Sequence, residues 1–143
     1  SLDTFLVLLY YFTSTKKRGD TMAWNLNSDR PIFIQIVERI EMDIISGKYK
    51  PGDKLPSVRD LAAEAAVNPN TMQKAFTELE RTGLVFSQRT TGRFITEDTS
   101  MIDELKSTLA KDKITELLSF MQQLGFQENE ILAMIGQTMK GEK

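Results

Sequence analysis

The sequence predicts a mainly α fold with a small β-hairpin wing (α+β), namely a winged helix-turn-helix followed by a two-helix C-terminal tail. Three observations support this fold class. Three helical patterns follow one another between residues 31 and 83, two short β-prone runs come directly after them, and helical periodicity returns from Met101. We therefore expect a winged helix-turn-helix domain over residues 22–99 and a helical domain over residues 100–143.

The first expected helix begins with Pro31 in its first turn and is stopped by Gly47. Its apolar residues recur at helical spacing: Phe33, Ile36, Val37, Ile40 and Ile44. A loop rich in proline and glycine follows, and Ser57 is then placed to cap a second helix of two to three turns. This pair of helices forms the first half of the predicted motif.

The third expected helix has the most definite start signal, because Asn68 is a favoured N-cap and Pro69 suits the first helical position. The helix ends at Gly83. Its apolar positions fall on one face: Met72, Ala75, Phe76 and Leu79. The polar residues of its first turns are therefore expected to face solvent: Asn70, Thr71, Gln73, Lys74 and Thr77.

Two short β-prone runs, residues 84–88 and 93–96, are joined by a turn over residues 89–92. We call residues 84–96 the wing. From Met101 a long helix extends to Leu124 and Gly125, and a last helix follows. Two helices in about 40 residues cannot enclose their own apolar faces, so the tail must pack on the first domain or on a second copy. The expected dimerisation residues are Ile102, Leu105, Leu109, Leu117, Leu118, Met121, Ile131, Leu132 and Ile135.

The composition favours a binding protein over an enzyme. The chain has 143 residues, 41% hydrophobic and 27% charged, which is ordinary for a globular domain. It contains no cysteine and no histidine, so thiolate or histidine metal sites and histidine-based catalysis are excluded. We predict no catalytic residue, no metal site and no cofactor. The lack of cysteine fits the cytoplasm, which we expect as the location.

The first 21 residues are expected to be a leader or a non-native extension, with Met22 as the true start. The apolar run over residues 2–12 precedes its basic residues, the reverse of the order in a signal peptide. The run is also roughly half as long as a membrane-spanning helix. We therefore predict no membrane partner.

Charge is unevenly distributed along the predicted domain. Acidic residues gather in and beside the first helix, whereas Arg81, Arg89 and Arg93 lie in a stretch without acids. In a winged helix-turn-helix, the third helix enters the DNA major groove and the wing reaches the backbone or minor groove. Amide and hydroxyl side chains of the third helix can bond base edges, and Lys74 can bind phosphate or guanine. Ser57 and Arg59 lie where the second helix meets the DNA backbone.

Three successive motifs resemble the DNA-binding domain of GntR-family bacterial transcription regulators. They are the run Leu55-Pro56-Ser57-Val58-Arg59-Asp60-Leu61-Ala62, the run Val67-Asn68-Pro69-Asn70-Thr71-Met72, and the run Glu78-Leu79-Glu80-Arg81-Thr82-Gly83-Leu84-Val85. The resemblance spans residues 31–96, and the helix start with the short tail is similar to the YtrA subfamily. It implies a cytoplasmic homodimer that represses its own operon, often one encoding an ABC transporter.

The resemblance implies DNA contacts on the second helix, the third helix and the wing. With Lys54 added from the preceding loop, the expected DNA-binding residues are Lys54, Ser57, Arg59, Asn68, Asn70, Thr71, Gln73, Lys74, Arg89, Thr91 and Gly92. The chain departs from the family where Pro69 and Gln73 replace arginines found in many members. It also departs in the wing, where Thr90-Thr91-Gly92 replaces the usual glycine-x-glycine.

The expected partner is a double-stranded DNA operator with an inverted repeat, since a two-fold dimer reads two half-sites about 34–36 Å apart or a multiple of that. Two alternatives stay open. The winged helix can act as a protein–protein interaction module without DNA binding, and a small-molecule effector can bind between the tail and the first domain.

Overall fold

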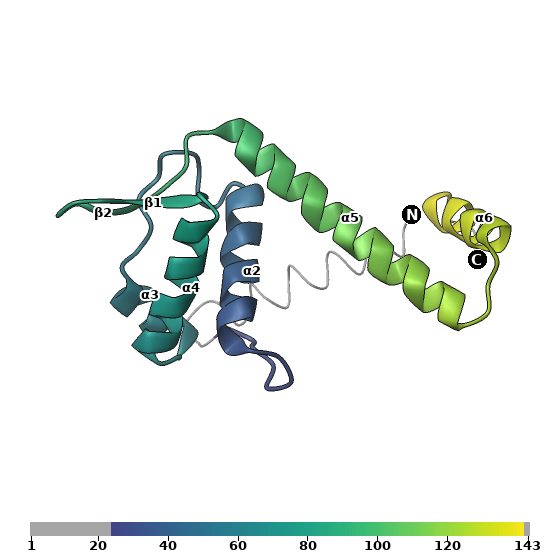
Figure 1. The fold of residues 1–143 in the computed structure, drawn as a ribbon, viewed down its shortest axis with the longest axis horizontal. Coiled ribbons are helices and arrows are strands. Elements are labelled where there is room, and N and C mark those ends of the chain that lie inside the picture. The colour runs from purple at the N-terminus through teal and green to yellow at the C-terminus, as the bar shows by residue number, and fades with distance from the viewer. Residues whose placement is uncertain (1–23, 142–143) are drawn as a thin grey trace. The chain divides into compact units, whose positions relative to one another are not determined.

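The computed structural model describes residues 24–141, so the prediction for residues 1–21 lies outside the described residues. The elements in chain order are α2 (Ile32–Ile45), α3 (Val58–Ala65), α4 (Pro69–Arg81), β1 (Val85–Gln88), β2 (Gly92–Ile95), α5 (Thr99–Gln123) and α6 (Glu128–Met139) (Figure 1). This order of three helices, a hairpin and two further helices confirms the predicted fold class.

The described chain divides into two compact units, with the division inside α5 between Lys106 and Ser107. The first unit contains α2, α3, α4, the hairpin and the beginning of α5. The remainder of α5 and all of α6 belong to the second unit. The functional division at residue 99 into a DNA-binding domain and a dimerisation domain stays a prediction.

Both helices of the predicted helix-turn-helix begin at the caps expected from the sequence. The Ser57 hydroxyl accepts a hydrogen bond from the Asp60 backbone N–H at 3.0 Å, and Asn68 Oδ1 accepts one from the Asn70 N–H at 2.7 Å. Pro69 is the first residue of α4. Pro31 differs slightly from its prediction, because it is the N-cap of α2 with an extended ψ of 130° and lies outside the first turn.

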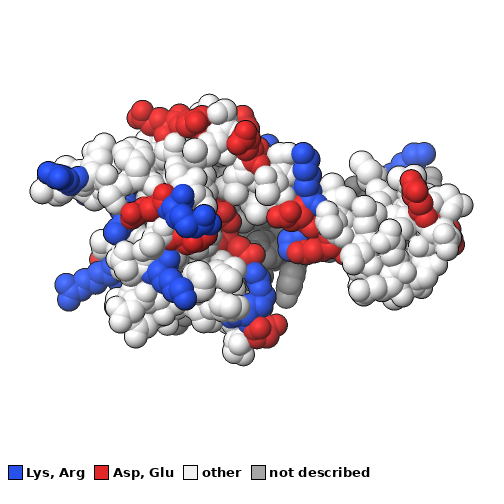
Figure 2. Space-filling view, viewed as in Figure 1, with Lys and Arg blue, Asp and Glu red and all other residues white. Residues whose placement is uncertain are grey.

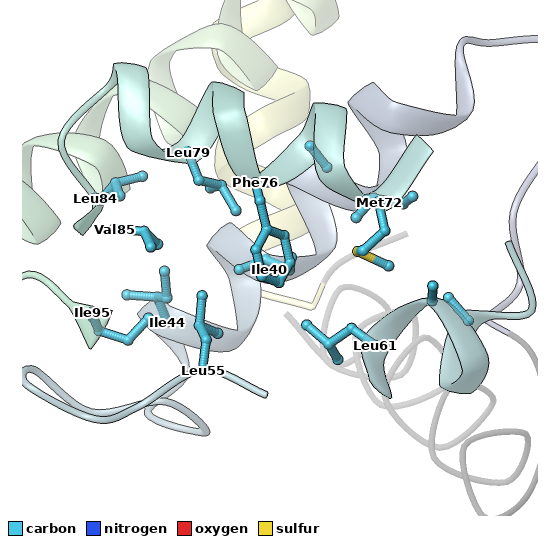
Figure 3. Packing of buried hydrophobic residues seen from close by; sticks show 14 of the residues in the cluster. Ile40, Ile44, Leu55, Leu61, Met72, Phe76, Leu79, Leu84, Val85 and Ile95 are labelled. Atoms are coloured by element: carbon cyan, nitrogen blue, oxygen red, sulfur yellow. The ribbon is translucent and has the colours of Figure 1, made fainter. Parts of the chain in front are cut away.

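The core of the first unit lies beneath α4. All four apolar residues predicted for the inner face of this helix are fully buried, and Figure 3 shows Phe76 of α4 meeting Ile40 of α2 at the centre of the cluster. The helix also packs against α3 and β1. Further members of the cluster are Ile36, Ile44, Leu55, Leu61, Leu84, Val85 and Ile95. Burial of this face leaves the opposite face of α4 directed outward.

The wing is an antiparallel hairpin in which Val85 pairs with Ile95 and Phe86 with Phe94. Gly92 was expected in the turn and instead begins β2, with a φ of +121° that favours glycine. The loop before α3 runs alongside β2, because the Leu55 N–H donates to the Arg93 carbonyl at 2.8 Å. The wing is therefore joined to the start of α3 by backbone hydrogen bonds.

In the tail, α5 is one continuous helix, which agrees with the single long helix predicted from Met101. At the start of α6, the Gln127 N–H donates to Glu130 Oε1 at 3.0 Å, and Glu130 lies in the first turn of the helix. Large apolar side chains remain exposed on both tail helices: Ile114, Leu117, Phe120, Leu132, Met134 and Met139.

Candidate nucleic-acid interface

The outward face of α4 carries the side chains predicted to read base edges. Asn70, Gln73 and Lys74 are exposed, and Thr71 is half-buried at the edge of the face. Gln73 is steadied by its own helix, since its Nε2 donates to the Thr77 hydroxyl at 3.4 Å. The first two turns of α4 therefore present amide and hydroxyl groups on a helix that is fixed by its buried face.

Two of the predicted residues on this face have partners within the protein. Asn68 Oδ1 is committed to the α4 cap, so its acceptor is occupied in the free protein. The Lys74 ammonium lies 4.1 Å from the centre of the Phe33 ring on α2, a cation–π contact. Sequence reasoning assigned Phe33 only to the core side of α2, and the spacing of the chain offered no signal for this contact.

The start of α3 and the tip of the wing face one another across a cleft of about 500 Å³. Its lining brings together four predicted DNA-binding residues, namely Lys54, Ser57, Thr91 and Gly92. The approach is close, because a Cβ atom added to Gly92 would lie 2.9 Å from Lys54 Cε. Arg59 is exposed on α3 and Arg89 on the wing, and neither lines this cleft.

The arginines that gave the sequence its basic stretch differ in their surroundings. Arg81 forms an ion pair with Glu78 on the same helix at 2.5 Å, and Arg93 forms one with Glu80. Within residues 24–141, Arg89 has no acidic partner. The expectation of three arginines without acids is therefore corrected, because helix spacing and wing packing bring the two glutamates beside Arg81 and Arg93. Figure 2 shows basic side chains projecting at the free end of the wing and beside α3.

Acidic side chains of α2 and α4 approach each other on another side of the first unit. Burial, together with the nearby carboxylates of Glu38 and Glu78, raises the pKa of Glu41 to about 6. Burial also raises the pKa of Asp43, against the opposing effect of Lys48 and Arg39. The expected concentration of acidic residues around the first helix is thus present in the structure.

The residues predicted for dimerisation differ in how far they are buried. Ile102 and Leu105 are half-buried and pack against the core of the first unit, and their part in dimerisation stays a prediction. Met121 and Ile131 are buried, at 7% and 3% exposure. Leu117 and Leu132 are exposed, at 44% and 64%. The remaining members are half-buried: Leu109, Leu118 and Ile135.

Two kinds of feature are missing from the part of the chain that the structure describes. Residues 24–141 contain no group of three or more acidic, histidine or cysteine side chains that could hold a metal ion. Over the same residues, no helix is both long and apolar enough to cross a membrane.

The chain is similar to known bacterial transcriptional regulators. The family described as "Bacterial regulatory proteins, gntR family" matches residues 34–95, which span α2 to the wing. The HTH-type transcriptional regulator YhcF of Bacillus subtilis is 40% identical over 105 residues, which cover 73% of this chain and 87% of the relative. The HTH-type transcriptional repressor YtrA of the same organism is 41% identical over 97 residues, which cover 68% and 70%.

Solved structures agree with this assignment. A GntR family transcriptional regulator from Listeria monocytogenes superposes with a TM-score of 0.73 at 39% identity, over 78% of this chain and 98% of that one. A transcriptional regulator from Oenococcus oeni has a TM-score of 0.68 at 26% identity, over 84% and 98%. The chain therefore belongs to the GntR family of bacterial transcriptional regulators and carries that family's DNA-binding helix-turn-helix domain.

Proposed function

We propose that the protein is a homodimeric, sequence-specific repressor that acts in the cytoplasm on the operon encoding it. The observation that carries the proposal is the exposed polar face over the first turns of α4, next to the cleft between α3 and the wing. Similarity to the repressor YtrA supports repression over activation. Family resemblance adds the expectation that the operon encodes an ABC transporter.

In the proposed complex, α4 enters the major groove and its first two turns face the base edges. Gln73 and Asn70 carry amides of the type that pairs with adenine. Lys54, Ser57 and Arg59 bind the DNA backbone from the start of α3, and the wing tip with Arg89 binds it on the other side of the cleft. Lys74 leaves Phe33 to contact phosphate, which exchanges a cation–π contact for an ion pair.

The proposed dimer forms through the tail. Leu117 and Leu132 leave apolar surface open to solvent that a second copy of the tail would cover. A two-fold pair of first units then reads an inverted repeat, with half-site centres about 34–36 Å apart or a multiple of that distance.

DNA reading is tested with a duplex that the unchanged protein selects from a randomised pool. Gln73→Ala is expected to cost about 1–3 kcal/mol at one base pair, because a base contact is sequence-specific. Lys74→Ala is expected to weaken binding to all sequences. It should also reduce the slope of log affinity against log salt concentration by about 1, the amount that one lost phosphate contact predicts. Gln122→Ala and Lys113→Ala remove the same residue types from exposed positions on α5 and serve as controls. Unchanged affinity in both α4 variants would reject this face as the reading surface.

Dimerisation is tested by sedimentation of Leu117→Asp, with Ser119→Asp as the matched control. Ser119 is exposed on the opposite side of α5, since two helical residues are about 200° apart. Leu117→Asp is expected to be monomeric and to lose its preference for an inverted repeat over a single half-site. A Leu117→Asp variant that still sediments as a dimer argues against the tail interface. Repression is tested by placing a reporter under the operon's own promoter, where deletion of the regulator must raise expression.

A further inference from the structure

The Arg93 side chain on β2 contacts two residues of α4, at a point nearer the wing tip than the base of the hairpin. Its guanidinium forms an ion pair with Glu80, and it lies 5.2 Å from the centre of the Phe76 ring. Both charged side chains are partly shielded, with 27% exposure for Arg93 and 32% for Glu80. Partial shielding and a stacked ring strengthen such a pair relative to one in open solvent.

The position of Arg93 in the hairpin explains why this contact matters. Val85 and Ile95 anchor the base of the hairpin in the core, and the tip residues beyond them are exposed. A two-stranded hairpin is only marginally stable by itself. Arg93 is two residues nearer the tip than Ile95 and shares its face of the strand, so it extends the anchorage outward. The Arg93 carbonyl also accepts from the Leu55 N–H, which brings the loop before α3 to the same point.

We propose that Arg93 is a positioning residue whose pairing with Glu80 fixes the angle between the wing and α4. With the pair in place, Arg89 and Thr91 reach the DNA backbone when the start of α4 lies in the groove. Arg93 itself carries a charge already neutralised by Glu80, and it acts through the wing. This inference rests on the wing contact in the proposed function.

The sign of the Glu80→Gln effect separates this role from simple electrostatics. The substitution removes a negative charge from a protein that binds a polyanion, so charge alone would tighten binding. Loss of the wing anchorage would weaken it, because the released hairpin must then be ordered on DNA. Glu78→Gln is the matched control, since Glu78 lies two residues away on the same helix and pairs with Arg81 within that helix.

The experiment measures the affinity of full-length variants for the duplex selected by the unchanged protein, across a salt series. Glu80→Gln is expected to bind about five to ten times more weakly, the factor that corresponds to ordering one or two flexible side chains. Glu78→Gln is expected to bind equally well or more tightly. Equal or tighter binding by Glu80→Gln overturns the inference. Melting curves confirm that each variant is folded, and Arg93→Lys, which keeps the charge, is expected to retain more affinity than Arg93→Gln.

A double-mutant cycle with Arg89→Ala adds a readout that a loss of overall stability would not move. If the pair acts by positioning Arg89, the double variant Glu80→Gln/Arg89→Ala binds about as well as Arg89→Ala. Additive losses overturn the inference. Arg89→Ala with unchanged affinity refutes the wing contact of the proposed function, and the inference with it. Arg89→Ala with weak binding beside Glu80→Gln with normal binding refutes the positioning role alone.

Hydrogen exchange in the DNA-free protein gives an independent measurement. The Thr91 N–H donates to the Gln88 carbonyl at 3.3 Å near the wing tip. Glu80→Gln is expected to accelerate exchange of the wing amides and to leave those of the middle of α4 unchanged. Equal exchange rates in the wing with and without the pair would contradict the proposal.

Discussion

Replacing Glu41 with glutamine is expected to stabilise the protein at neutral pH and to flatten its pH dependence. Glu41 lies half-buried on α2 near Glu38 and Glu78, and burial with these like charges raises its pKa from 4.5 to about 6. The folded protein therefore binds the proton more tightly than the unfolded chain does. Between these two pKa values the folded state holds more protons, so the free energy of unfolding falls as the pH rises.

The magnitude follows from the difference between the two pKa values. At about 1.4 kcal/mol for each pKa unit, the full difference corresponds to about 2 kcal/mol. Because the carboxylate is partly solvated, screening reduces the expected contribution to about 1 kcal/mol. Below pH 4.5 Glu41 is protonated in both states and costs nothing. Above about pH 6 the full penalty is present, and Glu41→Gln removes it.

Urea unfolding of Glu41→Gln and the unchanged protein should be followed from pH 4 to pH 8. The two free energies of unfolding are expected to converge at the acid end and to separate by about 1 kcal/mol above pH 7. Glu64→Gln is the control, because Glu64 is exposed on α3 and lies outside this acidic trio. A Glu41→Gln variant whose stability depends on pH as steeply as that of the unchanged protein would refute the reasoning.

Three further predictions concern stability and can be measured by urea unfolding at pH 7. Asn68→Ala removes the α4 cap and is expected to lower the free energy of unfolding by about 1 kcal/mol. Asn68→Ser, which can still cap the helix, is expected to keep most of that stability. Gly92→Ala places a side chain at a φ of +121° against Lys54, and we expect a loss of about 1–3 kcal/mol, so unchanged stability would contradict this backbone geometry. Gln35→Leu breaks paired hydrogen bonds with the Asn27 backbone, both 2.8 Å, and should cost about 1–3 kcal/mol. Gln35→Glu should cost at least as much, because it sets a buried carboxylate oxygen against the Asn27 and Arg30 carbonyls that the Gln35 amide N–H groups now bond.

Local signals in the sequence predicted the helix-turn-helix well because caps and periodicity act over a few residues. Asn68 followed by Pro69 placed the start of α4 at the correct residue, and the spacing of Met72 and Phe76 identified its buried face. Gly92 shows where such reasoning loses accuracy. Glycine marks a turn by its conformational freedom, but the strand pairing that includes it in β2 depends on the partner strand.

The sequence by itself thus determined the order of the elements, the inner face of α4 and the family, since each is encoded in short-range pattern and motif. Tertiary structure alone decided that Arg93 is paired with an acid and which apolar residues of the tail pack on the first unit. Arg93 meets Glu80 across 13 residues, and Ile102 and Leu105 pack on the core of the first unit although their spacing matched that of the rest of the tail. Such contacts depend on how separate elements are placed in space, and the periodicity of one segment does not predict them.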